Sequence, residues 1–120
     1  MIAGTLGSVA FTEEELEFIA ENQIARVATA SKEGEPHVVP VLYEFDGTAF
    51  YFGGWNLARS LKFRNILENE KVAMVIDDVV SVLPWRPRGL EVRGTAKALR
   101  EGGRDYVMVV PSSKRSWGLG

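Results

Sequence analysis

The 120-residue sequence contains no cysteine and one histidine, His37. The absence of cysteine excludes disulfide bonds, thiolate zinc sites, iron–sulfur clusters and a cysteine nucleophile. A single imidazole has no evident catalytic partner, so His37 is interpreted as an ordinary strand residue. No apolar run approaches the roughly 20 residues of a membrane helix, and residues 1–10 lack the basic flank of a signal peptide. We therefore expect a cytoplasmic protein without a metal site or a membrane partner.

Charge is unevenly distributed along the chain. Residues 1–50 contain nine acidic and two basic residues, whereas residues 51–120 contain seven acidic and twelve basic ones. A basic second half favours an anionic partner, either a phosphorylated cofactor or a nucleic acid. The sequence pI of about 5.5 argues against a dedicated nucleic-acid binder. The aromatic residues also do not form a stacking platform on one strand pair, which makes an RNA-binding barrel the weakest interpretation.

The length and pattern predict one domain, residues 11–120, preceded by a flexible arm, residues 1–10. A helix is expected to begin after Thr12, because Thr12 and Glu15 have the spacing of a capping box, and to end near Asn22. Its buried stripe is predicted to be Leu16, Ile19 and Ala20. A second helix is expected at residues 57–69.

Alternating hydrophobicity and β-branched residues predict six strands. Asp77 and Asp78, whose side chains must point to opposite faces of a strand, are interpreted as ending the fourth strand. Two prolines and a glycine predict a loop at residues 84–89, and residues 111–120 are expected to form a tail. The fold class is therefore mainly β, a six-stranded antiparallel barrel with two short helices; the predicted strands are residues 24–30, 38–45, 48–52, 72–77, 90–99 and 106–110.

The start of the second helix has the composition of an anion site. Arg59, Lys62 and Arg64 lie in its first turns, where backbone N–H groups have no helical partner and the helix dipole is positive. Ser60 can either cap the helix or bind a phosphate oxygen. The alternative is a solvated basic helix face.

Three other features leave two interpretations open. Pro40 lies within the second strand, so that strand is at a sheet edge or a bulge, which either frees backbone groups for a flat ring or bends the barrel. Trp55, Trp85 and Trp117 can line an aromatic pocket or cover a barrel end. Arg86 and Arg88 can reach an anion or an acidic neighbour.

The order of these motifs resembles a known family. The stretch IARVATASKEGEPHVVPVLYEFDGTAFYF is similar to the opening meander of the pyridoxamine 5′-phosphate oxidase-like, flavin-binding split β-barrels. The stretch SLKFRNILENEKVAMVIDD resembles the phosphate-binding helix of that family and the strand that follows it. PWRPRGLEVRGTAKAL and the terminal SWGLG resemble a subgroup of enzymes that depend on coenzyme F420. The resemblance extends over residues 11–119.

The resemblance implies a split barrel that forms homodimers, with FMN or the deazaflavin F420 in a cleft at the subunit interface. It places the cofactor phosphate at Ser60 and Lys62, with Asn65 further along the helix. The ring is expected to lie against Val38, Val39, Pro40 and Val41, and Trp117 is expected to cap the partner's cofactor. Arg59 is a further candidate for the phosphate, and Arg86, with Arg88, for the acidic tail of F420.

The favoured function is therefore an oxidoreductase that transfers hydride between F420 and a small organic substrate. The cofactor carries the reactive chemistry, so no catalytic side chain is assigned. One alternative is an FMN-binding relative of pyridoxamine phosphate oxidase; vitamin B6 oxidation itself is not expected, because the chain lacks the longer C-terminal region of those enzymes. A second alternative is a carrier of flavin or F420 without turnover.

Overall fold

A computed structural model describes residues 9–54 and 56–120 of the chain. The predicted N-terminal arm lies almost entirely outside the described residues, and so does Trp55. Helix α1, Glu13–Glu21, begins after Thr12, whose hydroxyl accepts a hydrogen bond from the Glu15 N–H while the Glu15 carboxylate accepts one from the Thr12 N–H. This confirms the predicted capping box, and the helix ends at the C-cap Asn22 as expected.

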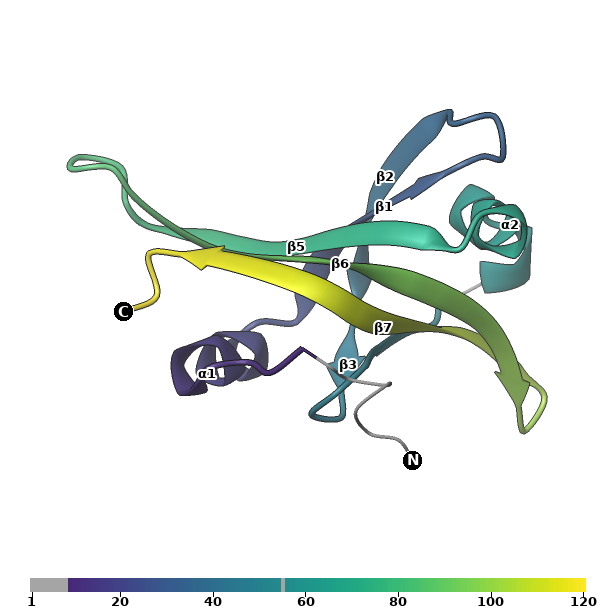
Figure 1. Cartoon of the computed structure of the whole chain (residues 1–120), viewed down its shortest axis with the longest axis horizontal. Helices are drawn as coiled ribbons and strands as arrows, with labels where there is room; N and C mark the ends of the chain where they lie inside the picture. The colour runs from purple at the N-terminus through teal and green to yellow at the C-terminus, as the bar shows by residue number, and fades with distance from the viewer. Residues whose placement is uncertain (1–8, 55) are drawn as a thin grey trace.

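The described residues form one antiparallel sheet of seven strands, with strand order β2-β1-β5-β6-β7-β4-β3. The mainly β, antiparallel class is thus confirmed. Figure 1 shows long strands β5, β6 and β7 side by side, crossed by β1 and β2, with helices α1 and α2, Leu61–Glu68, at opposite ends. The strands are β1 Ile24–Ala30, β2 Pro36–Leu42, β3 Glu44–Phe45, β4 Phe50–Phe52, β5 Lys71–Ser81, β6 Arg86–Glu101 and β7 Arg104–Trp117.

The extra strand arises because the predicted second strand is divided at Tyr43 into β2 and β3. These two segments occupy opposite edges of the sheet, although a single residue joins them. The connection therefore draws the two edges of the curled sheet together at Tyr43. The pairing between β1 and β2 is extended by one hydrogen bond, in which the Tyr43 N–H donates to the Gln23 carbonyl at 3.0 Å. Pro40 lies on the edge strand β2 in unbroken register with β1, so the edge interpretation is correct and the bulge interpretation is wrong.

Strands β5, β6 and β7 are longer than predicted. The expected loop at residues 84–89 and the expected tail at residues 111–120 are largely strand, because β6 begins at Arg86 and β7 ends at Trp117. Both prolines within these strands lie beside register shifts, Pro87 near the shift between Val79 and Ser81, and Pro111 opposite Gly94. Proline is tolerated in a sheet at such irregularities, so composition alone misassigned both segments.

Asp77 and Asp78 do not end a strand, since β5 continues to Ser81. Their opposite orientations are confirmed by their partners: Asp77 forms an ion pair with Arg26, and Asp78 with Arg88. The Arg88 guanidinium binds both carboxylate oxygens of Asp78, with Nε 2.8 Å from Oδ1. Arg88 therefore reaches an acidic neighbour, and the hydrogen bonds from Arg88 lower the pKa of Asp78.

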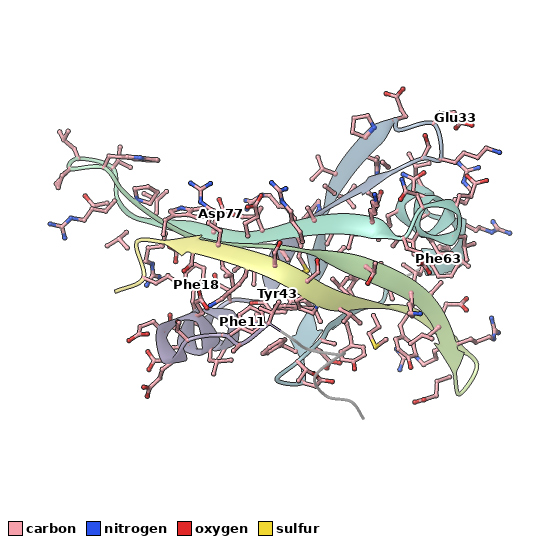
Figure 2. All side chains as sticks on the ribbon, in the orientation of Figure 1. Phe11, Phe18, Glu33, Tyr43, Phe63 and Asp77 are labelled. Carbon is pink, nitrogen blue, oxygen red and sulfur yellow. The ribbon has the colours of Figure 1, made fainter. Side chains whose placement is uncertain are left out.

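The core lies between the sheet and the two helices. Its largest fully buried side chains come from both helices and from strands β1, β4, β5, β6 and β7, namely Phe18, Val27, Phe50, Ile66, Ile76, Leu90, Val92, Val107 and Val109. Phe18 on α1 and Phe63 on α2 lie at opposite ends of the sheet (Figure 2).

The predicted stripe of α1 was right only for Ile19. Leu16 and Ala20 are exposed, and the buried positions are Glu15, Phe18 and Ile19. Glu15 is buried because its carboxylate also accepts hydrogen bonds from Lys114 and Ser116 of β7. Burial alone would raise the pKa of Glu15, but these hydrogen bonds lower it. These hydrogen bonds to β7 turn the Glu15 side of α1 toward the sheet, and Leu16 and Ala20 therefore stay exposed.

Candidate functional site

An open cleft of about 1430 Å³ lies where β2, β4, the start of α2 and the β6–β7 turn meet. The 3₁₀-helix η1, Leu57–Arg59, and the helix α2, Leu61–Glu68, form its basic side. The cleft is lined by Pro40, Val41, Leu42, Tyr43, Glu44, Tyr51, Phe52, Gly53, Gly54, Asn56, Leu57, Ala58, Arg59, Lys62, Glu101, Arg104, Asp105 and Tyr106. Four of the predicted site residues, Pro40, Val41, Arg59 and Lys62, are therefore brought together by the fold.

The basic side is built around Ser60, where the predicted single helix is interrupted. The Ser60 hydroxyl accepts a hydrogen bond from the Phe63 N–H at 3.2 Å and donates one to the Leu57 carbonyl at 2.6 Å. Ser60 thus caps α2 and fixes η1 against it. Arg59 lies just before Ser60 and Lys62 just after it, and both line the cleft. Within residues 9–54 and 56–120 neither forms an ion pair.

The strand side presents Pro40, Val41 and Leu42 of β2. Because β2 is an edge strand, part of its backbone has no partner within the described sheet. Val38 and Val39 belong to the same strand but do not line the cleft. Val38 is 62% exposed, whereas Val39 packs against the core.

Tyrosines form the remaining wall, and sequence reasoning missed them. The Tyr43 hydroxyl donates to the Ile19 carbonyl at 2.6 Å, and burial raises the pKa of Tyr43 to about 12. The Tyr51 hydroxyl donates to Asp46 at 2.7 Å, and this hydrogen bond is the largest cause that raises the pKa of Tyr51 to about 12. Both phenols are therefore neutral at physiological pH. Tyr106 and Arg104 complete this wall from β7.

Asp46 organises the turn behind this wall. Desolvation alone would raise its pKa, but hydrogen bonds from the Ala49 and Thr48 N–H groups, the Tyr51 hydroxyl and the Thr48 hydroxyl lower the pKa of Asp46 to about 2. The carboxylate is therefore ionised throughout the neutral range, and the turn 46–49 keeps a fixed shape.

Asn65 is a buried scaffold residue. It is 4% exposed, and its side-chain amide donates a hydrogen bond to the Thr29 hydroxyl at 3.0 Å. This bond joins α2 to β1. Asn65 lines a second, smaller cavity of about 500 Å³ instead of the main cleft.

Arg86 and Trp117 do not line the cleft of this chain. Both are at the end of the sheet formed by the β5–β6 hairpin, where Trp117 is paired with Gly89. A Cβ atom at Gly89 would lie 2.1 Å from the Trp117 ring, so the indole packs directly on the backbone of β6. The structure places neither residue near Lys62 in the same chain.

No group of three or more His, Cys, Asp or Glu side chains is arranged to hold a metal ion in the described part of the chain. Likewise, no helix within residues 9–54 and 56–120 combines the length and apolar character needed to cross a membrane.

A curled antiparallel sheet whose two edges meet, with a cationic helix start facing an edge strand, defines the class of split β-barrels. The family model of pyridoxamine 5′-phosphate oxidase matches residues 11–118. The chain belongs to this family, as the sequence motifs predicted.

Similar proteins agree with this assignment. A 5a,11a-dehydrotetracycline/5a,11a-dehydrooxytetracycline reductase from Streptomyces rimosus is 37% identical over 120 residues, covering 91% of this chain and 84% of the reductase. Among solved structures, a conserved hypothetical protein from Mycobacterium tuberculosis superimposes with a TM-score of 0.75 at 20% identity, covering 92% of this chain and 86% of that one. An F420 reductase superimposes with a TM-score of 0.62 at 24% identity, covering 78% and 89% of the two chains. These structural likenesses concern the fold.

Proposed function

We propose that this protein is an oxidoreductase that binds the deazaflavin F420 in the cleft and transfers a hydride between it and a small organic substrate. The observation that carries the proposal is the pairing of an edge strand, at Pro40 and Val41, with two cations at a capped helix start, Arg59 and Lys62, across one cleft. The relative from Streptomyces rimosus is named as a reductase, which supports redox chemistry in this chain.

The cleft residues fit a phosphorylated ring cofactor. Lys62 and Arg59 supply positive charge beside the first N–H groups of α2, where a phosphate is bound favourably. Ser60 supports this site by capping the helix, and Asn65 supports it by holding α2 against β1. The unpartnered edge of β2, at Pro40 and Val41, offers backbone groups to a flat ring.

F420, when bound, supplies the hydride chemistry. The protein's residues have to orient the ring and exclude water from it. Pro40 and Leu42, both exposed, present apolar side chains to the cleft. A low-polarity surface of this kind suits a reaction in which no side chain must accept or donate the hydride.

The proposed site is completed by a second copy of the chain. The tip of the β5–β6 hairpin exposes Val80, Val82, Leu83 and Trp85, with Leu83 93% exposed. A contiguous exposed apolar patch normally marks an interface. Arg86 and Trp117 lie at this same end, so a homodimer that buries the tip can bring them to the partner's cleft, where they would meet the cofactor.

Dimerisation is expected to depend on this tip. In analytical ultracentrifugation at micromolar concentration, the wild-type protein should sediment as a dimer and Leu83→Asp as a monomer, because a carboxylate cannot be buried unpaired at an apolar contact. The control is Leu67→Asp on α2, which changes a leucine that is 64% exposed and should leave the dimer intact. A wild-type protein that sediments only as a monomer would exclude both the dimer and the shared site.

The cofactor is tested by titrating the purified protein with F420 and, separately, with FMN, followed by fluorescence. We expect tight F420 binding and weak FMN binding. Preference for FMN would contradict the deazaflavin assignment and favour the FMN-binding alternative. F420 binding without hydride transfer to any acceptor would favour a carrier, and binding of neither cofactor would refute the proposed function.

A further inference from the structure

The cleft contains an aromatic wall that the cofactor assignment does not use. Strands β4 and β7 pair with Tyr51 opposite Met108 and Phe52 opposite Val107. In this register Tyr51 and Tyr106 are diagonal neighbours on one face, and residues so placed are within reach of aromatic side chains. Their ring centroids are 6.2 Å apart with an angle of 49° between the planes. The alternate residues Phe52 and Val107 are buried in the core, so the tyrosines lie on the opposite face.

The wall is held in place before any ligand binds. The Tyr51 hydroxyl is fixed by Asp46, which is itself fixed by the N–H groups of Thr48 and Ala49, each 2.8 Å from the carboxylate. A ring restrained at its hydroxyl loses little further freedom on binding, which favours recognition of a rigid partner. Tyr106 packs on this restrained ring.

A cation lies at the open end of the wall. Arg104 precedes Tyr106 by two residues in β7, so both occupy the same face of the strand, and both line the cleft. The neighbouring carboxylate of Asp105 binds Arg100 at 3.2 Å. No ion pair to Arg104 is present in the part of the chain that the structure describes.

Two carboxylates face the same space. Glu44 is the cross-strand partner of Tyr51, and Glu101 is that of Arg104. Both line the cleft. Their charge lowers the positive potential around Arg104 and so disfavours a polyanion such as a phosphate ester, which leaves the Arg104 guanidinium as a contact for a single ionised oxygen.

We propose that Tyr51, Tyr106 and Arg104 form the substrate subsite, which takes a flat, conjugated hydride acceptor with one ionised oxygen, such as an enolate or a phenolate. The inference rests on the proposed function, because the acceptor must lie against the cofactor ring. The tyrosine rings stack on the acceptor, and Arg104 binds its oxygen. In the reduction, the acceptor gains a hydride from reduced F420 and a proton from water, and the cofactor returns one proton to water and is left oxidised.

Two quinones that differ in charge serve as probes. 2-Hydroxy-1,4-naphthoquinone is ionised at neutral pH, and 2-methyl-1,4-naphthoquinone is neutral. Each is titrated calorimetrically into the protein loaded with oxidised F420, which cannot turn over. Steady-state reduction of both quinones by reduced F420 is measured in parallel.

Arg104→Gln is expected to weaken binding of the hydroxyquinone by about 5- to 10-fold, as for loss of a charge-assisted contact at a partly exposed site. Binding of the methylquinone should remain within about twofold, since it has no charge to lose. The control is Arg93→Gln, which removes an arginine on β6 whose side chain is 69% exposed. This variant should bind both quinones with the affinity of the wild type.

Tyr106→Ala is expected to weaken the binding of both quinones by about 3- to 10-fold, because stacking is lost. Tyr106→Phe keeps the ring and should retain binding. F420 affinity should stay unchanged in every variant. A loss of F420 affinity in Arg104→Gln would overturn the inference, because Arg104 would then belong to the cofactor site. If the wild type binds F420 but neither quinone, the subsite is refuted while the proposed function stands; if it does not bind F420, the proposed function itself fails.

Discussion

Lys62→Glu is expected to weaken F420 binding by about 30- to 100-fold, because a charge-assisted contact to the phosphate is replaced by repulsion. The reversal acts where the α2 dipole and the first free N–H groups of the helix favour an anion. The fold should tolerate the change, since Lys62 takes part in no ion pair among the described residues. The measurement is a fluorescence titration of F420, with a thermal melt to verify folding.

The matched control for this variant is Arg64→Glu. Arg64 lies on the same helix, is exposed and lines the smaller cavity instead of the main cleft. The two variants change the net charge equally, so a long-range effect of charge would appear in both and would fade with added salt. Equal loss in both variants, or unchanged affinity in Lys62→Glu, would show that Lys62 does not contact the phosphate.

Gly94→Ala is expected to destabilise the protein by about 3 kcal/mol, at the upper end of the cost of overpacking. A Cβ atom at Gly94 would lie 2.1 Å from the Val110 carbonyl oxygen and 3.0 Å from the Pro111 Cα. Both contacts are with the backbone of β7, at the register shift between Arg93 and Gly94. Gly94 itself is paired with Val72 of β5 on one side and with Pro111 of β7 on the other, so its backbone cannot move aside as a flexible side chain can.

Urea unfolding measures this loss directly. The control is Gly53→Ala, because a Cβ atom there would meet its nearest neighbour, the Asp105 carbonyl oxygen, only at 3.9 Å. We expect the control to change the free energy of unfolding by less than about 0.5 kcal/mol, as for ordinary surface substitutions. Equal stability of the two variants would mean that β6 and β7 do not approach each other this closely at Gly94.

The features predicted correctly from the sequence are local in the chain. The Thr12–Glu15 capping box depends on residues three apart, and the basic start of α2 depends on residues within two turns. Two of the strand errors share one cause: Pro87 was placed in a loop and Pro111 in a tail, whereas each lies next to a register shift that accommodates it. Such a shift depends on the partner strand, so a proline in the sequence does not reveal it.

The residues of the candidate site also fall into two groups: those indicated by nearby sequence and those brought to the cleft by pairing between distant strands. Arg59, Lys62 and Pro40 were found because the sequence around each is distinctive. Tyr51 and Tyr106 were missed because nothing near either residue in the sequence indicates that β4 pairs with β7. The family resemblance supplied the expected place of the cofactor, but it did not identify this wall.

The sequence by itself determined the strand periodicity, the capped helices and a cationic helix start, because hydrogen bonds and side-chain spacing within a few residues decide these features. The tertiary structure alone decided which strands are neighbours, and therefore which side chains share the cleft. Pairing between distant strands is set by the burial of a whole sheet face, and a shift of one residue in register would turn every side chain of a strand to the other face. The meeting of Lys62, Pro40, Tyr106 and Arg104 in one cleft is a property of the folded chain.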